Sequence, residues 1–166
     1  MSSRLGQRVR YGLFLCVFAI AWAVSPIAVR SAPYAAFVMD ARTGEVIHAR
    51  NADTPLHPAS LTKMMTLYIA FQAIERGEVN LDTMITVTSQ AANEPPSKLG
   101  LRSGQQIKLR YLIRAAAVKS ANDAAMAIGI GLSGSKEGFA RRMNQTAAAM
   151  GMTRTHFLNP NGLTEV

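Results

Sequence analysis

The stretch Pro58–Gly77, "PASLTKMMTLYIAFQAIERG", decides how the rest of the sequence is interpreted. Apolar residues follow Leu61 at steps of three and four and on most other sides as well, which predicts a central helix buried in a domain core. Arg76 and Gly77 place a cation in its last turn and a glycine just beyond, which predicts its end. Ser60 and Lys63 stand three residues apart at its start, so their Cβ atoms would lie on one face, about 5–6 Å apart.

The Ser60–Lys63 pair has two interpretations. In the first, Ser60 is a nucleophile in acyl transfer and Lys63 is the amine that takes its proton, which requires a lowered lysine pKa. The helix start would favour negative charge developing near Ser60. In the second, Ser60 caps the helix and Lys63 is solvated. The spacing alone does not decide between them, because Ser133 and Lys136 repeat it in a glycine-rich turn before a later helix.

A second polar group interrupts the apolar pattern at "KSANDAA", residues 119–125. It separates two predicted helices, Leu109–Val118 and Ala121–Leu132. A functional interpretation makes Ser120 a hydroxyl that relays a proton and Asn122 an amide that orients a substrate. The alternative is a capped helix start, with Ser120 holding a free N–H group and Asn122 in the first turn.

The remaining pattern predicts a mixed α+β domain. Ala36–Met39 and Val46–Arg50 are two strands of a hairpin around a polar turn. A short alternating stretch at Met84–Thr88 is followed by irregular structure rich in Gly, Pro, Ser and Asn. A fourth helix follows, with Ser135 as its cap and Gly151 as its stop.

The first 31 residues predict a secretory signal peptide, which leaves a mature chain from about residue 32. Three arginines precede an apolar run, Tyr11–Val24, and small residues follow it. The run is about 14 residues long and therefore shorter than the roughly 20 that a membrane-spanning helix needs. Cys16, the single cysteine of the chain, lies in this run, so the exported product would carry neither a thiol nor a disulfide.

The distribution of charge does not support a nucleic-acid face. The chain has 18 basic and 10 acidic residues. Removing Arg4, Arg8, Arg10 and Arg30 with the signal leaves 14 basic against 10 acidic residues, a net charge of +4. These residues are scattered and are not interleaved with aromatics, so only a mild preference for anionic surroundings follows.

Other chemistries have little support in the sequence. His57 lies three residues before Ser60, but it stands between prolines and lacks an acidic partner in position for a serine–histidine triad. Histidines and acids do not show metal-ligand spacing, and there is no glycine-rich phosphate loop. We therefore expect neither a metal nor another cofactor.

Together, "PASLTKMMT" and the "KSANDAA" that follows about 60 residues later resemble the serine D-alanyl-D-alanine carboxypeptidases, the low-molecular-weight penicillin-binding proteins. The opening "DARTGEVIHARN" and the closing "THFLNPNGL" are also similar to that family. The resemblance implies the β-lactamase and penicillin-binding-protein transpeptidase-like fold, an antiparallel sheet flanked by helices. It also implies that Ser60 is the acylated nucleophile, Lys63 the base, Ser120 a proton relay and Asn122 a substrate-binding residue.

The same resemblance implies partners and a location. The substrate would be the D-Ala-D-Ala end of peptidoglycan stem pentapeptides, and β-lactam antibiotics would mimic it. The protein would work in the periplasm or at the outer face of the cytoplasmic membrane, with possible peripheral membrane association in a full-length form. A class A β-lactamase-like hydrolase is the nearest competitor, but its second motif is normally Ser-Asp-Asn, and here Ala121 stands in the middle.

One departure from the family is large. Its third motif, Lys-Thr/Ser-Gly on a sheet strand, does not occur in these 166 residues. The sequence therefore predicts the N-terminal part of such a fold, with residues 32–166 as a partial catalytic domain. Two hypotheses from different classes remain: an enzyme sequence cut short, and a non-catalytic remnant that at most binds peptidoglycan.

Overall fold

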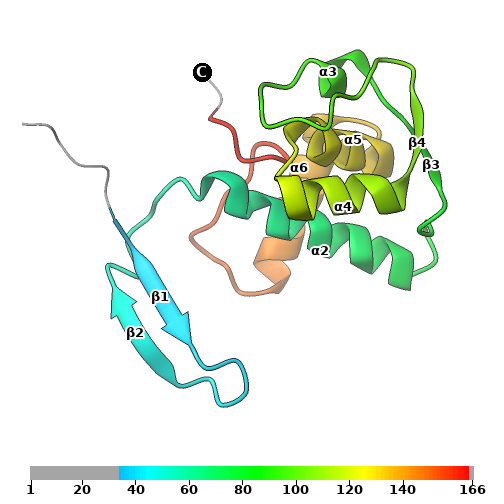
Figure 1. The fold of residues 1–166 in the computed structure, drawn as a ribbon. Helices are drawn as coiled ribbons and strands as arrows, with labels where there is room; N and C mark the ends of the chain where they lie inside the picture. Colours follow the sequence, from blue (N-terminus) through cyan, green and yellow to red (C-terminus); the bar gives the residue numbers. More distant parts are fainter. Residues whose placement is uncertain (1–33, 165–166) are drawn as a thin grey trace, which may run out of the picture. The chain divides into compact units, whose positions relative to one another are not determined.

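The computed structural model describes residues 34–164, which fall into two compact units divided after Ala52. The first unit contributes a β-hairpin and the second contributes the helices with a small sheet (Figure 1). The fold is α+β, and the described strands form two separate two-stranded antiparallel sheets. The predicted signal peptide lies outside the described residues. Within residues 34–164, no helix has both the length and the apolar character needed to cross a membrane.

The hairpin of the first unit is confirmed with its predicted bounds. Strand β1 (Ala36–Met39) pairs with β2 (Val46–Arg50), with Ala36 opposite Arg50 and an irregularity between Val38 and Met39. Oδ1 of Asp40 accepts hydrogen bonds from the N–H groups of Arg42 (2.9 Å) and Thr43 (2.8 Å), which builds the turn. Apart from the half-buried Ala36, the residues of both strands are exposed.

The second unit begins with a 3-10 turn and the predicted long helix. The turn η1 (Ala59–Leu61) leads directly into α2 (Thr62–Glu75). Gly77, at φ +72, follows the C-cap residue Arg76, so the predicted end of the helix is confirmed. The expectation that α2 is covered on nearly every side is wrong for the described chain: Leu61 is 67% and Met64 is 68% exposed. Tyr68 and Phe71 extend this exposed apolar face, while Ile69 on the opposite side is fully buried.

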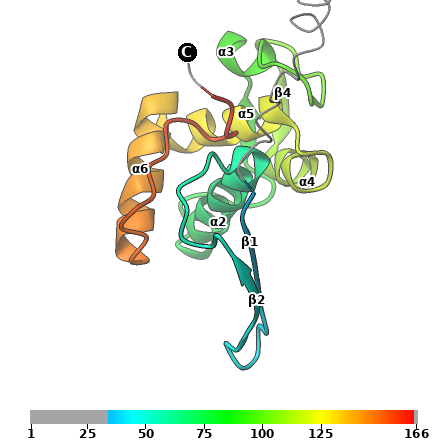
Figure 2. The same cartoon turned by 90° about the vertical axis from the view of Figure 1, so that its left-hand side faces the viewer.

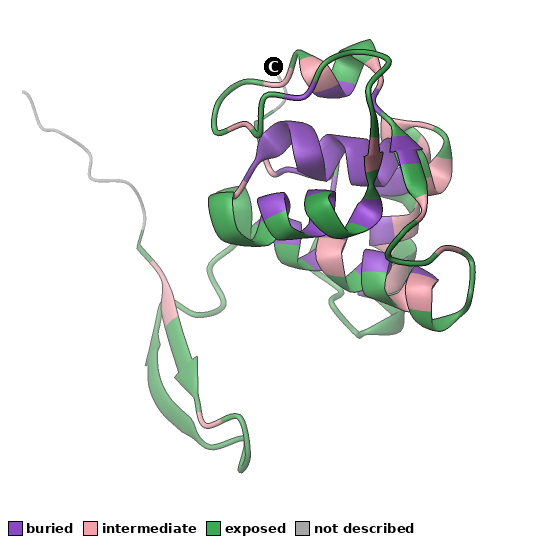
Figure 3. Ribbon diagram, turned by 45° about the vertical axis from the view of Figure 1, so that its right-hand side comes forward, coloured by how far each residue is buried: buried purple, intermediate pink, exposed green. Residues whose placement is uncertain are grey.

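The other elements pack around helix α5 (Asn122–Ser133), which is buried from Asn122 to Ile130. They are β3 (Met84–Thr86), α3 (Ser89–Ala92), β4 (Gln106–Lys108), α4 (Leu109–Lys119) and α6 (Lys136–Ala149). Helix α5 lies between α4 and α6 and also packs on α2 (Figure 2). Figure 3 shows α5 buried over most of its length, in contrast to α2 and α4, which each present an exposed side. Sheet β3–β4 pairs Ile85 with Ile107.

Two glycines let α5 approach its neighbours closely. A Cβ atom on Gly129 would lie 2.6 Å from Cγ of Pro160, and one on Gly131 would lie 2.8 Å from Cγ2 of Ile85. Both distances are shorter than real carbon–carbon contacts allow, so larger residues would push these segments apart. Close packing on α5 thereby holds the segment around Pro160 near the start of α2, where Oγ1 of Thr66 donates a 2.6 Å hydrogen bond to the Pro160 carbonyl.

Candidate active site

The structure brings Ser60 and Lys63 together at the junction of η1 and α2. The Lys63 amine donates a hydrogen bond to Oγ of Ser60 at 3.3 Å. Ser60 is exposed, whereas Lys63 is only 3% exposed. A reachable hydroxyl next to a desolvated amine is the arrangement that nucleophilic acyl transfer requires.

The alternative interpretation of the pair is wrong. The N-cap position of α2 is Leu61, and no side chain makes a capping hydrogen bond there or at the start of η1. Ser60 therefore does not cap the helix, and Lys63 is not solvated. The chain reaches Ser60 through Ala59, which has φ +48 in the left-handed region that residues other than glycine seldom adopt.

Lys63 is held by a turn that is distant in sequence. Its amine donates a second hydrogen bond, at 2.9 Å, to the backbone carbonyl of Asn161. Burial lowers the pKa of Lys63, and the nearby negative charge of Glu94 opposes that shift without reversing it. A lysine whose pKa is lowered by burial is better able to take a proton at neutral pH.

The segment Asn159–Gly162 forms this turn, and its first three residues are buried although two of them are asparagines. The N–H group of Gly162 donates to Oδ1 of Asn159 at 2.7 Å. Gly162 has φ +81, and its backbone lies against the Ala59 carbonyl so closely that a Cβ atom would overlap with it. The sequence did not predict the contact of this turn with Lys63, because Lys63 and Asn161 are 98 positions apart.

Ser120 lies at the break between α4 and α5. It is the C-cap residue of α4, with φ 55 and ψ 34, and its Oγ atom is buried. Among the described residues, this is the one buried side-chain oxygen or nitrogen atom without a hydrogen-bond partner. Such an atom costs about 1–3 kcal/mol, so its retention needs a reason. Ser120 does not cap α5, because the N-cap position is Ala121 and no side chain makes a capping hydrogen bond there, whereas the expected place of Asn122 in the first turn is confirmed.

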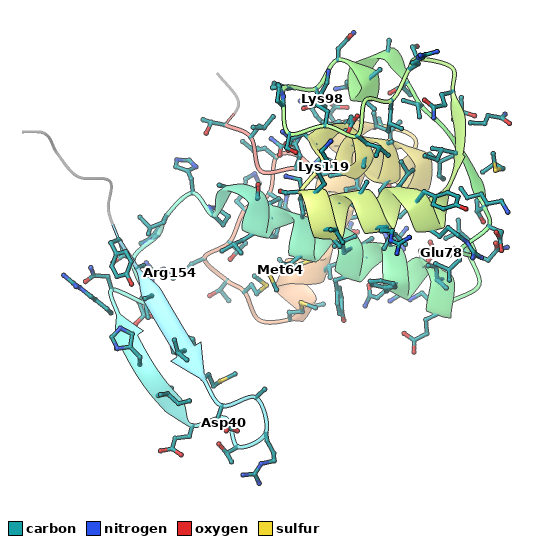
Figure 4. All side chains as sticks on the ribbon, viewed as in Figure 1. Asp40, Met64, Glu78, Lys98, Lys119 and Arg154 are labelled. Atoms are coloured by element: carbon teal, nitrogen blue, oxygen red, sulfur yellow. The ribbon has the colours of Figure 1, made fainter. Side chains whose placement is uncertain are left out.

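Asn122 lies in the first turn of α5 and is buried. Its side-chain amide donates to the Pro95 carbonyl at 2.9 Å, and its N–H group donates to the Ser97 carbonyl at 2.7 Å. The Ser97 hydroxyl in turn donates to the Lys119 carbonyl at 2.9 Å. Figure 4 shows Lys98 and Lys119 on the same side of the unit, where this loop meets the end of α4.

Two consecutive residues of the loop connect the two predicted motifs. The Pro95 carbonyl accepts the hydrogen bond from Asn122, and the carboxylate of Glu94 accepts one from the Asn161 side chain at 2.7 Å. Asn161 is the residue whose carbonyl holds Lys63. The sequence analysis did not identify Glu94 or Asn161, because neither residue belongs to a motif with a recognisable spacing. The one available signal was the polar sequence Asn159–Gly162, which contains Asn161.

The second serine–lysine pair does not form a site. Ser133 is the last residue of α5, and Lys136 is the first residue of α6 and lies 3.8 Å from a Glu137 oxygen. Oγ of Ser135 accepts a 2.9 Å hydrogen bond from the Gly138 N–H group, which confirms the predicted cap. His57 is exposed. Within residues 34–164, no group of three His, Cys, Asp or Glu side chains could hold a metal ion.

A serine hydroxyl hydrogen-bonded to a buried lysine three residues later, in an α+β fold, matches the Ser-x-x-Lys motif of the class that contains penicillin-binding proteins and class A β-lactamases. The chain belongs to one family of that class, described as D-alanyl-D-alanine carboxypeptidase (Peptidase_S11), which matches residues 22–166. It is similar to D-alanyl-D-alanine carboxypeptidase DacF of Bacillus subtilis, with 33% identity over 130 residues, covering 78% of this chain and 33% of DacF.

Solved structures agree with this family. The crystal structure of D-alanyl-D-alanine carboxypeptidase DacD from Francisella tularensis is 38% identical, with a TM-score of 0.76, and the match covers 89% of this chain and 37% of that one. Penicillin-binding protein D2 from Listeria monocytogenes, in its cefotaxime-bound form, is 29% identical with a TM-score of 0.68, over 82% of this chain and 56% of that one. The chain spans about a third of the length of the curated relatives it matches. The expected family and fold class are therefore confirmed.

Proposed function

We propose that this protein is a serine D-alanyl-D-alanine carboxypeptidase that acts on peptidoglycan stem peptides through an acyl-enzyme on Ser60. The observation that carries the proposal is the hydrogen bond between the Ser60 hydroxyl and the buried Lys63 amine. Family membership supports the substrate class of this proposal. The cefotaxime-bound relative supports β-lactam antibiotics as ligands that would mimic the substrate.

In this mechanism Lys63 takes the proton of Ser60 as Oγ attacks the carbonyl carbon of the penultimate D-alanine. The C–N bond to the terminal D-alanine then breaks, and the leaving amine receives a proton. Water hydrolyses the ester on Ser60 in a second step and regenerates the hydroxyl. The buried, unpartnered Oγ of Ser120 is suited to relay a proton during these steps.

Asn122 would contribute to the binding of the substrate peptide. Its Nδ2 atom already donates to the Pro95 carbonyl, so the amide is held in one orientation by the loop. A preorganised amide loses little side-chain entropy when it binds a peptide group. In this proposal the protein is exported and acts on peptidoglycan in the periplasm or at the outer face of the cytoplasmic membrane. A peripheral association with that membrane would keep the protein close to its peptidoglycan substrate.

Labelling with a fluorescent penicillin tests the proposal. The purified chain, shown to be folded by circular dichroism, should acquire one label on the peptide that contains Ser60. Ser60→Ala should abolish the label. Ser133→Ala is the matched control, because it removes the serine of the second pair with the same spacing, and it should label like the wild type.

The alternatives give different results in the same assay. A folded chain that is not labelled would reject catalytic competence and favour a non-catalytic peptidoglycan-binding protein, which a sedimentation assay with purified peptidoglycan would detect. Rapid turnover of the penicillin label, with release of the hydrolysed drug, would favour the β-lactamase-like alternative. Label on a residue other than Ser60 would refute the assignment of the nucleophile.

A further inference from the structure

Glu94 occupies a place in the site that the two sequence motifs do not account for. It follows the short helix α3, and its Oε2 atom accepts a 2.7 Å hydrogen bond from Nδ2 of Asn161. Asn161 is 2% exposed, so its side-chain amide must find its partners inside the protein. Glu94 supplies an ionised acceptor, which forms a stronger hydrogen bond than a neutral one.

Asn161 uses three different polar groups in three directions. Its carbonyl accepts from the Lys63 amine at 2.9 Å, its Oδ1 accepts from the Leu163 N–H group at 3.0 Å, and its Nδ2 donates to Glu94. These bonds fix both the rotamer and the backbone of one residue. A change at the Glu94 end is therefore transmitted to the carbonyl that holds the Lys63 amine.

Glu94 also acts on Lys63 through its charge. Burial lowers the pKa of Lys63, and the negative charge of Glu94 opposes this shift. Three other charged groups on the elements packed on α2 have partners of their own or lie in solvent. In α5, the Asp123 carboxylate accepts four backbone N–H groups, and in α6 the Arg142 side chain pairs with Glu78. The last residue of α4, Lys119, is exposed.

We propose that Glu94 is a positioning residue of this site: its carboxylate fixes Asn161, and thereby the carbonyl that holds the Lys63 amine, and it places one negative charge beside that amine. This inference rests on the proposed function for its consequence in catalysis, because it assigns Glu94 to the base. Removing the charge leaves the amine neutral at a lower pH, which makes it more available but also weaker as a base.

Competitive labelling of lysine amines tests the proposal without catalytic turnover. The folded chain is treated with trace isotopic acetic anhydride between pH 6 and 11, and mass spectrometry measures the labelled fraction of Lys63. Glu94→Gln removes the negative charge and keeps one oxygen that can accept the hydrogen bond from Asn161. We expect labelling of Lys63 at pH 8 to rise by about threefold or more, as removal of a nearby opposite charge predicts.

Glu75→Gln is the matched control. It removes the same charge from α2 itself, 12 positions after Lys63, or about 18 Å along the helix. That separation exceeds the Debye length of about 8 Å at physiological salt, so Lys63 labelling should stay at the wild-type level. Equal labelling of Lys63 in the wild type, Glu94→Gln and Glu75→Gln would overturn the proposal, because a purely structural Glu94 would leave the titration of the amine unchanged.

A measurement on the wild-type chain covers the case in which Glu94→Gln does not fold. The side-chain carboxyl carbon of Glu94, followed by NMR, should show a second inflection at the pH where Lys63 loses its proton, and a flat response there would overturn the proposal. The outcome is independent of the penicillin assay. A chain that is not labelled on Ser60 would reject the proposed function, while the titration of Lys63 would still decide the role of Glu94.

Discussion

Replacing Asp123 should destabilise the protein strongly, because its carboxylate organises the loop that connects the two motifs. Oδ1 accepts from the N–H groups of Leu99 and Ala124, both at 2.8 Å. Oδ2 accepts from those of Gly100 at 2.8 Å and Leu101 at 3.0 Å. Asp123 is fully buried. Asp123→Asn keeps the size of the side chain but turns one of the two acceptor oxygens into a donor.

The cost follows from which N–H groups lose their acceptor. Each oxygen serves one buried N–H group, of Leu101 or Ala124, and one partly buried group, of Gly100 or Leu99. Whichever way the new amide is turned, one group of each kind is left facing an NH₂ donor. A buried unsatisfied group costs about 1–3 kcal/mol, and the partly buried one costs less because water can reach it. We therefore expect Asp123→Asn to lower the free energy of unfolding by about 2–4 kcal/mol.

Urea unfolding, followed by circular dichroism at pH 7, measures this difference. The matched control is Asp40→Asn in the hairpin turn, where Oδ1 alone accepts both backbone N–H groups and the residue is half-buried. An asparagine oxygen can serve both bonds there, so the urea midpoint should fall much less than it does for Asp123→Asn. A midpoint for Asp123→Asn that falls no further than that of Asp40→Asn would refute the assignment of these hydrogen bonds to stability.

The pH dependence gives an independent check on Asp123. Burial alone would raise its pKa, but the N–H groups of Leu101, Leu99, Gly100 and Ala124 outweigh burial and hold the pKa below its usual range. A group with a lowered folded-state pKa contributes stability that is complete above its unfolded value of about 3.9 and is lost as the pH falls through the folded value. The difference in stability between the wild type and Asp123→Asn should therefore narrow below pH 4, and a difference that stays constant would contradict the argument.

Two further substitutions test other parts of the structure. Gly162 has φ +81, and Gly162→Ala adds a Cβ atom that would overlap with the Ala59 carbonyl. We expect this change to lower the free energy of unfolding in urea by about 3 kcal/mol or more and to reduce penicillin labelling of Ser60. Wild-type stability and labelling would show that this contact is loose. Asp82→Asn removes exposed ion pairs with Lys108 (2.8 Å) and Arg110 (2.6 Å). We expect no measurable change in the urea midpoint at about 0.15 M salt, because exposed ion pairs contribute little to stability. A clear drop in the midpoint would show that these pairs fix the β3–β4 sheet.

The sequence predicted the elements whose signals are local. Apolar periodicity and helix-end signals placed α2, α4 and α5 to within one or two residues of their observed bounds. Alternation and a polar turn did the same for the hairpin β1–β2. The short helix α3 was not predicted, because its four residues carry no periodicity. Oγ1 of Thr88 caps this helix by accepting a hydrogen bond from the Ala91 N–H group at 3.2 Å. A threonine at this position is equally typical of a loop, so the sequence alone did not indicate a helix.

The site was only half predictable, for a physical reason. Ser60 and Lys63 lie on consecutive turns of one helical segment, so their spacing alone brings them together. Asn161 contacts Lys63 from one loop, and Glu94 contacts Asn161 from another. The positions of both loops depend on how α5 packs on its neighbours. Nothing in the local sequence of a loop encodes which distant carbonyl will face a buried amine. Such contacts follow from tertiary packing, and they are the ones a pattern of residue types cannot supply.

Backbone strain marks the start of both motifs. Ala59 and Ser120 both have positive φ values, 48 and 55. Ala59 directly precedes Ser60, and Ser120 is the serine of the second motif. Glycine would adopt this conformation without cost, whereas other residues lose about 1–2 kcal/mol in it. At Ala59 the left-handed turn lets the chain enter η1 with its carbonyl against Gly162, and at Ser120 it ends α4 with the hydroxyl turned into the protein. The fold thus holds strained backbone at Ala59, next to Ser60, and at Ser120 itself, and packing of the Asn159–Gly162 turn and of α5 is what keeps it there.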